Sequence, residues 1–439
     1  MKRIFSILTV GTSFVAAAFG QTAPKTPPTF TKDVAPIVQQ HCESCHRPGE
    51  GTPFSLVTYQ DVQTKALMIK DVIQEGIMPP WFADPSVGHF SNDRSLTKAQ
   101  IDTIVAWVNA GTPRGDPKDM PAPLNFVEGW SIPKPDVIFQ IPRPFPIPAT
   151  GIMQYQYVIV PTGFTTDKWV QMAEVRPTNR AVVHHIVAYV RAPGSTYFKG
   201  EKKEVFFEQP PVKATNKKVD TSALPSDFLV GYAPGQPAEI WKPGEAKLIK
   251  AGSDIVFELH YMPNGTATED RAKLGLVFAK EPPEERVMTL AATNGTFKIP
   301  PGDPNYGANA SFDVLQNVTL LGLHPHMHER GKNMTYWVVY PDGKKVEILN
   351  VPHYNWRWQL WYNLEKPISL PKGSKIECTA HWDNSANNPQ NPDPTKTITW
   401  GDQSFDEMMV CFFDLAFPAN MPVRDLFPLP KVETASVAK

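Results

Sequence analysis

An apolar run ends in three alternating histidines in the sequence Val318-Thr319-Leu320-Leu321-Gly322-Leu323-His324-Pro325-His326-Met327-His328. The pattern predicts a strand, and side chains two residues apart on a strand point to the same face. His326 and His328 can therefore hold one metal ion between them without distortion of the backbone. The alternative is an edge strand whose imidazoles are solvated.

The composition predicts a large protein rich in β-structure. The chain has 439 residues, of which 41% are hydrophobic, and this is enough for several packed cores in roughly two to four domains. Its 46 prolines are spread along the sequence, which favours turns and short strands over long helices. The 43 basic and 44 acidic residues nearly balance, so the charge gives no reason to expect binding to nucleic acid or to an anionic membrane surface.

Residues 1–20 have the pattern of a signal peptide. Lys2 and Arg3 precede an apolar run over residues 4–19, and small residues flank a cleavage point before Gln21. We therefore expect a periplasmic or secreted protein, with an uncleaved anchor as the alternative. We expect no transmembrane domain, because no later segment is long and apolar enough to span a bilayer.

A motif for covalent haem attachment follows in the sequence Cys42-Glu43-Ser44-Cys45-His46. In the C-x-x-C-H form, both thiols add to the haem vinyl groups and the histidine becomes an axial iron ligand. A zinc site would need a second close pair of ligands, and Cys378 and Cys411 are far away in the sequence. A redox dithiol would need a strand–helix context that is not apparent here.

The residues around this motif resemble a small class I cytochrome c. A thioether in the proline-stiffened loop Gly76-Ile77-Met78-Pro79-Pro80-Trp81 suits the sixth haem ligand. We prefer Met78 to Met68, which has a core position in a helical pattern, and to His89. Thr97 and Gln100 form a capping box that predicts a helix ending at Gly111. We therefore predict an all-α cytochrome c domain over residues 27–115 with one covalent haem c, followed by a Pro-rich linker over residues 116–135.

The rest of the chain predicts two tandem all-β antiparallel sandwich domains, over residues 136–290 and 291–425, with a tail over residues 426–439. Short apolar runs alternate with turn residues, which is typical of jelly-roll-like sandwiches. The expected strands cover residues 153–161, 168–175, 181–191, 254–261, 273–278, 312–323, 334–339, 356–363, 374–382 and 407–417.

A second group of histidines lies in the first β region. His184 and His185 are neighbours in one predicted strand, and His260 ends another. Adjacent side chains on a regular strand point to opposite faces, so one ion could not bind both. A β-bulge, or the use of Nδ1 by one ring and Nε2 by the other, would resolve this. Otherwise one histidine is in the core and the other is exposed.

Met408 could join His326 and His328, because a soft sulfur with two imidazoles suits a copper ion that must become Cu(I). A core methionine is the alternative.

The order of these motifs resembles the copper type II, ascorbate-dependent monooxygenases, which include the peptidylglycine α-hydroxylating and dopamine β-hydroxylating enzymes. The resemblance covers roughly residues 136–420. It consists of His184-His185, then His260, then His326-x-His328-x-x-Gly331-Lys332, and finally Asp406-Glu407-Met408.

The resemblance implies two copper ions that face each other across an open cleft. His184, His185 and His260 would hold the electron-transferring copper. His326, His328 and Met408 would hold the copper that binds O₂ beside the substrate. It also implies strands that flank this second site and carry Cys378 and Cys411, which we expect to form a disulfide in an oxidising compartment. Two buried thiols are the alternative.

Three positions differ from the amidating enzymes. His324 stands where those enzymes have an arginine that binds the peptide carboxylate, and Phe412 stands where they have a tyrosine. Met409 occupies the place of a disulfide-forming cysteine, and Cys411 comes two residues later. These differences make peptide amidation a poor expectation and leave the substrate open.

The sequence therefore predicts an exported monooxygenase that hydroxylates a C–H bond of a small organic substrate with O₂. Its electron donor would be an ascorbate-like reductant or another redox protein, and we expect the fused haem to pass electrons to the His184, His185 and His260 copper. One alternative is a non-catalytic copper-binding electron-transfer protein. The other is a haem protein whose β region only docks a partner. His353 and His381 have no predicted role.

Overall fold

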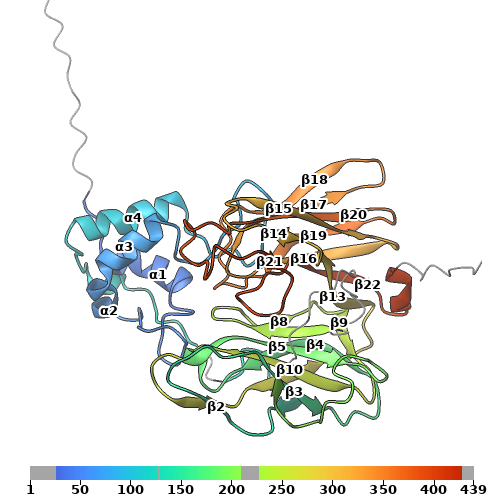
Figure 1. Cartoon of the computed structure of the whole chain (residues 1–439). Helices are drawn as coiled ribbons and strands as arrows, with labels where there is room; N and C mark the ends of the chain where they lie inside the picture. Colours follow the sequence, from blue (N-terminus) through green and yellow to red (C-terminus); the bar gives the residue numbers. More distant parts are fainter. Residues whose placement is uncertain (1–25, 127–128, 209–226, 428–439) are drawn as a thin grey trace, which may run out of the picture.

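The computed structural model describes residues 26–126, 129–208 and 227–427 (Figure 1). The predicted signal peptide over residues 1–20, and most of the predicted tail, lie outside the described residues. Helices gather at one end of the molecule, and the strands form two stacked bodies beside them (Figure 1). No helix within these ranges is both long and apolar enough to cross a bilayer.

Helices in the described chain are few and short. They are α1 (Ala35–His41), α2 (Tyr59–Thr64), α3 (Ala66–Gln74) and α4 (Lys98–Asn109), with single turns at Phe30–Val34, Pro117–Asp119, Arg180–Val182 and Val423–Leu426. The longest is α4, with 12 residues, and Thr97 and Gln100 form the expected capping box at its start. The helices pack around a small apolar cluster that includes Val34, Ile104 and Trp107.

The predicted all-α cytochrome c domain over residues 27–115 is wrong. The described chain is mostly β-sheet, and one helix alone reaches 12 residues. Long stretches of the N-terminal region are irregular, because prolines and glycines interrupt the helical pattern between α3 and α4. In addition, Trp81, Phe82 and Phe90 pack on the core of the distant second β region rather than on the helices.

One sheet runs through both β regions. Its strand order is β1-β12-β4-β9-β13-β22-β16-β19, and β8 pairs with β4. The strands are β1 (Val137–Gln140), β12 (Lys273–Phe278), β4 (Lys168–Arg176), β9 (Glu245–Ile249), β13 (Glu285–Thr293), β22 (Val410–Pro418), β16 (Val318–His326), β19 (Tyr362–Leu370) and β8 (Glu239–Ile240). The two tandem sandwiches expected from the sequence therefore share one sheet, and the predicted boundary after residue 290 lies inside β13.

The junction within this sheet is a short parallel pairing. Glu285 and Arg286 of β13 pair with Glu245 and Ala246 of β9, whereas β13 pairs with β22 along its whole length. Beside it, the buried Lys247 Nζ donates to the carbonyl of Phe228 at 2.6 Å and to Thr289 Oγ1 at 2.8 Å. A buried ammonium must have such partners, so these bonds join strands on both sides of the junction.

Each half of the shared sheet is covered by a smaller sheet. The first half faces β6 (Phe207–Glu208), β3 (Gln156–Pro161), β10 (Asp254–Tyr261), β5 (Val183–Arg191) and β7 (Phe228–Tyr232). The second half faces β15 (Tyr306–Asp313), β20 (Lys375–Trp382), β17 (Gly331–Val339) and β18 (Lys345–Val351). Two small ribbons complete the strands: β2 (Phe145–Ile147) with β11 (Thr268–Asp270), and β14 (Lys298–Ile299) with β21 (Ile398–Thr399). We call the two layered halves the first and second sandwich.

Cys378 and Cys411 link the layers of the second sandwich. Cys378 lies on β20 and Cys411 on β22, both are buried as thiols, and the Cys411 side chain is hydrogen-bonded with that of Cys378. Burial raises the pKa of the Cys378 thiol well above its usual value.

We predict that these two thiols form a disulfide in the exported protein. Closing a loop of roughly 30 residues should stabilise the fold by about 3–4 kcal/mol in the chain-entropy model. Alkylation in denaturant without reductant should leave both residues unmodified, whereas prior reduction should make both react. Full alkylation without reductant would contradict the prediction.

Candidate metal centres

The first histidine group lies where β5 and β10 pair. His260 stands opposite His185, but the next pair joins Tyr261 to Val183, so His184 is an extra residue in β5. This register shift is a β-bulge, which breaks the strict alternation of faces. The bulge removes the objection that neighbouring histidines on a regular strand cannot share one ion.

The three rings of this group converge. One nitrogen from each of His184, His185 and His260 lies within 4.8 Å of the others. The Nδ1 atoms of His184 and His185 are 3.0 Å apart. His184 Nε2 and His260 Nδ1 are buried without a hydrogen-bond partner among the described residues. Because buried ring nitrogens normally have partners, this arrangement fits a bound metal ion.

Electrostatics favour the neutral form that metal ions need. Burial, reinforced by the neighbouring histidines, lowers the pKa of His184 to about 3 and that of His260 well below its usual value. Both rings therefore offer lone pairs at neutral pH. His185 Nε2 lies 3.4 Å from a carboxylate oxygen of Glu258, an acidic partner of the kind that orients metal-binding histidines.

The second histidine group lies at the end of β16. The rings of His326 and His328 are 5.2 Å apart, and His326 Nδ1 donates to the side-chain oxygen of Gln359 at 2.9 Å. This bond leaves Nε2 of His326 as the acceptor nitrogen. His328 Nδ1 is buried without a partner among the described residues. Burial lowers the pKa of His326 to about 4 and that of His328 well below its usual value.

Glu407, the residue before Met408, binds the backbone beside this group. The buried Glu407 carboxylate accepts the backbone N–H of His328 at 2.9 Å and that of Arg330 at 2.6 Å. Burial raises the pKa of Glu407 to about 7, against the effect of these bonds. His326 pairs with Val410 at the end of the β16–β22 register, two residues along the chain from Met408. The structure thus brings together the segments that carry all three predicted ligands.

The two histidine groups are linked by packed side chains. Trp356, from the second sandwich, stacks on His184 of the first, with ring centroids 5.2 Å apart. The Trp356 carbonyl accepts a bond of 2.7 Å from Gln359, whose side-chain oxygen binds His326. His326 also contributes to the lowered pKa of His184. The open cleft implied by the resemblance is therefore bridged in this structure.

The residues that differ from the amidating enzymes lie beside the second group. His324 is buried, donates from Nδ1 to the Leu360 carbonyl at 2.9 Å and stacks on Trp361 with centroids 4.9 Å apart. Its ring centroid is 5.7 Å from that of Phe412. Burial lowers the pKa of His324 to about 3, so a cationic contact like that of the missing arginine is not available here at neutral pH.

The strand predicted over residues 356–363 is mostly wrong. β19 begins at Tyr362, and the residues before it are irregular because their side chains and carbonyls bind the histidines. The sequence did not predict three contacts of the histidines, which are those of Gln359, Glu258 and Trp356. No fixed spacing connects them to the histidines that they contact, since Glu258 lies on β10 and both Trp356 and Gln359 lie in the irregular segment before β19. Of the unassigned histidines, His353 is exposed and His381 bonds to Asn333.

The C-x-x-C-H motif lies in a turn that continues α1. The backbone N–H groups of Cys45 and His46 both donate to the Cys42 carbonyl, so Cys42, Cys45 and His46 share one side of the turn. Burial raises the pKa of the Cys42 thiol to about 12 and lowers the pKa of His46. His46 stacks on Phe54 and bonds its carbonyl through Nδ1, which leaves Nε2 for a ligand role. The three residues fit covalent haem attachment.

The choice of a sixth ligand stays a prediction. Met78 is half-buried in the loop after α3. Met68, which we expected in the core, is 49% exposed on α3, so that expectation is wrong.

Known proteins do not give this chain a family. No protein-family model matches it, and no curated protein matches it. Among solved structures it is similar to that of the infectious bursal disease virus Gx strain, with 10% identity, a TM-score of 0.17, and coverage of 67% of this chain and 76% of that chain. The infectious bursal disease virus VP2 subviral particle gives 9% identity, a TM-score of 0.18, and coverage of 68% and 77%. A likeness this weak carries no argument about fold or function.

Proposed function

We propose that this protein is an exported copper-dependent monooxygenase that hydroxylates a C–H bond of a small organic substrate. The observation that carries the proposal is the pair of histidine groups with depressed pKa values and unpartnered ring nitrogens, joined through Trp356 and Gln359. Burying an imidazole nitrogen without a hydrogen-bond partner costs free energy, and a metal ion that accepts its lone pair would offset that cost.

The donor set supports copper over other metals. His184, His185 and His260 would hold one ion, and His326, His328 and Met408 the other. Imidazoles with a thioether suit an ion that alternates between Cu(I) and Cu(II). Bound copper would supply the one-electron steps of O₂ activation. Gln359 and Glu258 then fix the rings, and the Trp356 contact joins the two groups.

The position of the C-x-x-C-H turn supports electron entry at the first group. Glu50 forms an ion pair with Arg180, whose backbone begins the turn that leads directly into β5 and His184. A Cβ at Gly51 would meet the Arg180 carbonyl oxygen at 2.9 Å, so the two backbones are in close contact. A haem held by Cys42, Cys45 and His46 would therefore lie beside the segment that carries His184.

A non-catalytic copper-binding electron-transfer protein is the second candidate. The observation that favours it is the close packing between the two groups, together with neutral His324 and Phe412 at the positions where the related enzymes bind their substrate. Saturable copper binding without consumption of O₂ would support this candidate.

We predict two coppers per chain in the full-length exported protein, measured by elemental analysis. EPR of the oxidised form should show type 2 signals, one lost in His184→Ala and the other in His328→Ala. His353→Ala, which replaces an exposed histidine, serves as the matched control and should retain both signals. Iron without stoichiometric copper, even after reconstitution with copper, would exclude the oxygenase proposal.

We predict one haem that stays attached after denaturation and is lost in the double variant Cys42→Ser/Cys45→Ser. In anaerobic rapid mixing, the reduced haem should be reoxidised by bound Cu(II) on the timescale of turnover. His184→Ala should slow this step because it removes a ligand of the accepting copper. If the reduced haem persists in the anaerobic copper-loaded protein for much longer than one turnover takes in the presence of O₂, electron entry by this route is wrong.

A further inference from the structure

Residues 81–93 leave the helical region and pack on the second sandwich. Trp81 and Phe90 contact the Tyr362 ring with centroids 4.8 and 5.5 Å away. The Ser91 N–H donates to the Asn363 carbonyl at 2.8 Å, and Phe90 forms an antiparallel bridge with Leu364. This segment therefore extends the sheet beside β19. In the sequence it lies close to α3 and α4 and far from β19.

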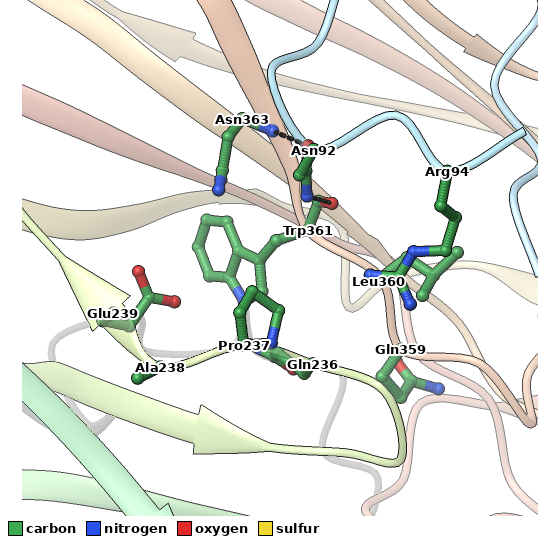
Figure 2. A pocket seen from close by; sticks show the side chains of 10 residues that line it. All are labelled: Asn92, Arg94, Gln236, Pro237, Ala238, Glu239, Gln359, Leu360, Trp361 and Asn363. Carbon is green, nitrogen blue, oxygen red and sulfur yellow. Dashed lines mark hydrogen bonds between the residues drawn. The ribbon is translucent and has the colours of Figure 1, made fainter. Parts of the chain in front are cut away.

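Asn92 binds the backbone on both sides of Tyr362. Its side-chain amide donates to the Trp361 carbonyl at 2.8 Å, and its side-chain oxygen accepts the Asn363 N–H at 3.0 Å (Figure 2). One side chain thus fixes both the position and the direction of the chain at the point where β19 begins.

The segment that Asn92 holds is the one that orients His326 of the second group and its neighbour His324. The Leu360 carbonyl and the Gln359 side-chain oxygen accept bonds from Nδ1 of His324 and His326, both at 2.9 Å. An oxygen acceptor requires the proton on Nδ1, so these bonds select one tautomer in each ring. The Trp361 ring, next to the carbonyl that Asn92 binds, stacks on His324.

The neighbouring Arg94 ties the same segment to the C-x-x-C-H turn. Its carbonyl accepts a bond from His41 at 3.1 Å, and His41 precedes Cys42. Its guanidinium donates to the Gly235 carbonyl of the first sandwich at 3.0 Å. Asn92, Arg94, Glu239, Gln359 and Trp361 line a cavity of about 20 Å³ where the three parts meet, which is about the space of one water molecule (Figure 2).

We propose that Asn92 is a positioning residue for the second histidine group: it holds residues 361–363 so that Gln359 and Leu360 keep His326 and His324 in their Nδ1–H tautomers. The segment over residues 81–93 then helps to set the geometry of the second site, although it comes from the N-terminal part of the chain. The consequence for copper binding rests on the proposed function, whereas the effect on the imidazoles does not.

The test uses the full chain with ¹⁵N-labelled histidine and the variant Asn92→Ala. In the metal-free wild type, ring ¹⁵N shifts should show His324 and His326 as single Nδ1–H tautomers, assigned by loss of their signals in His324→Ala and His326→Ala. Asn92→Ala should give mixed tautomers for both rings. Asn109→Ala, an exposed asparagine on α4, is the matched control and should leave the tautomers unchanged.

Copper affinity provides the second readout. Loss of a partner that orients a metal ligand typically weakens metal binding about 10–100-fold, which we expect for Gln359→Ala. Asn92 acts one step further away, so we expect Asn92→Ala to weaken the His326 and His328 site by about ten-fold at most, with the His184 group unaffected. If Asn92→Ala does not fold, Asn92→Asp keeps the acceptor for the Asn363 N–H and should shift the tautomers in the same direction.

Lower thermal stability with wild-type tautomers would overturn the proposal, because Asn92 would then be purely structural. Altered tautomers in a protein that binds no copper would uphold the positioning role and reject the proposed function instead.

Discussion

The parallel contact between β9 and β13 is the constraint on which both histidine groups depend. It makes one sheet out of the central strands of two sandwiches, and Lys247 completes the junction with bonds to Phe228 and Thr289. A buried ammonium without such bonds would be unfavourable, so opening the junction would cost free energy. β16 is a strand of this continuous sheet, and the smaller sheet that carries β5 and β10 packs on its first half, so the two histidine groups are held in one packed body.

That packing places unpartnered nitrogens from two sandwiches close together. His184 and His326 are connected through Trp356 and Gln359, and His326 contributes to the lowered pKa of His184, although their strands belong to different sheets. Burial keeps the rings neutral, and neutrality makes them ligands rather than cations. The same packing bridges the cleft that the resemblance led us to expect.

The N-terminal region contacts the segments that carry or orient both groups. The Glu50–Arg180 ion pair joins the C-x-x-C-H turn to the segment before His184. Asn92 joins the same region to the backbone beside His324 and His326. The N-terminal part of the chain is therefore packed against the segments that position both groups, unlike a flexible linker.

The sequence by itself determined which side-chain types could hold a metal ion or a haem, and how neighbouring residues of each motif lie relative to one another. Alternation along a strand predicted that His326 and His328 share a face, and the spacing of Cys42, Cys45 and His46 predicted that they lie on one turn, because both patterns depend on neighbours in the chain. The two histidine rings do lie close together, although β16 ends at His326. The sequence also showed that His184 and His185 needed a bulge. The tertiary structure decided the rest: the short helices that exclude an all-α cytochrome c domain, the shared sheet, and the roles of Gln359, Trp356 and Asn92. These features depend on contacts between residues far apart in the sequence, and local sequence patterns do not predict such contacts.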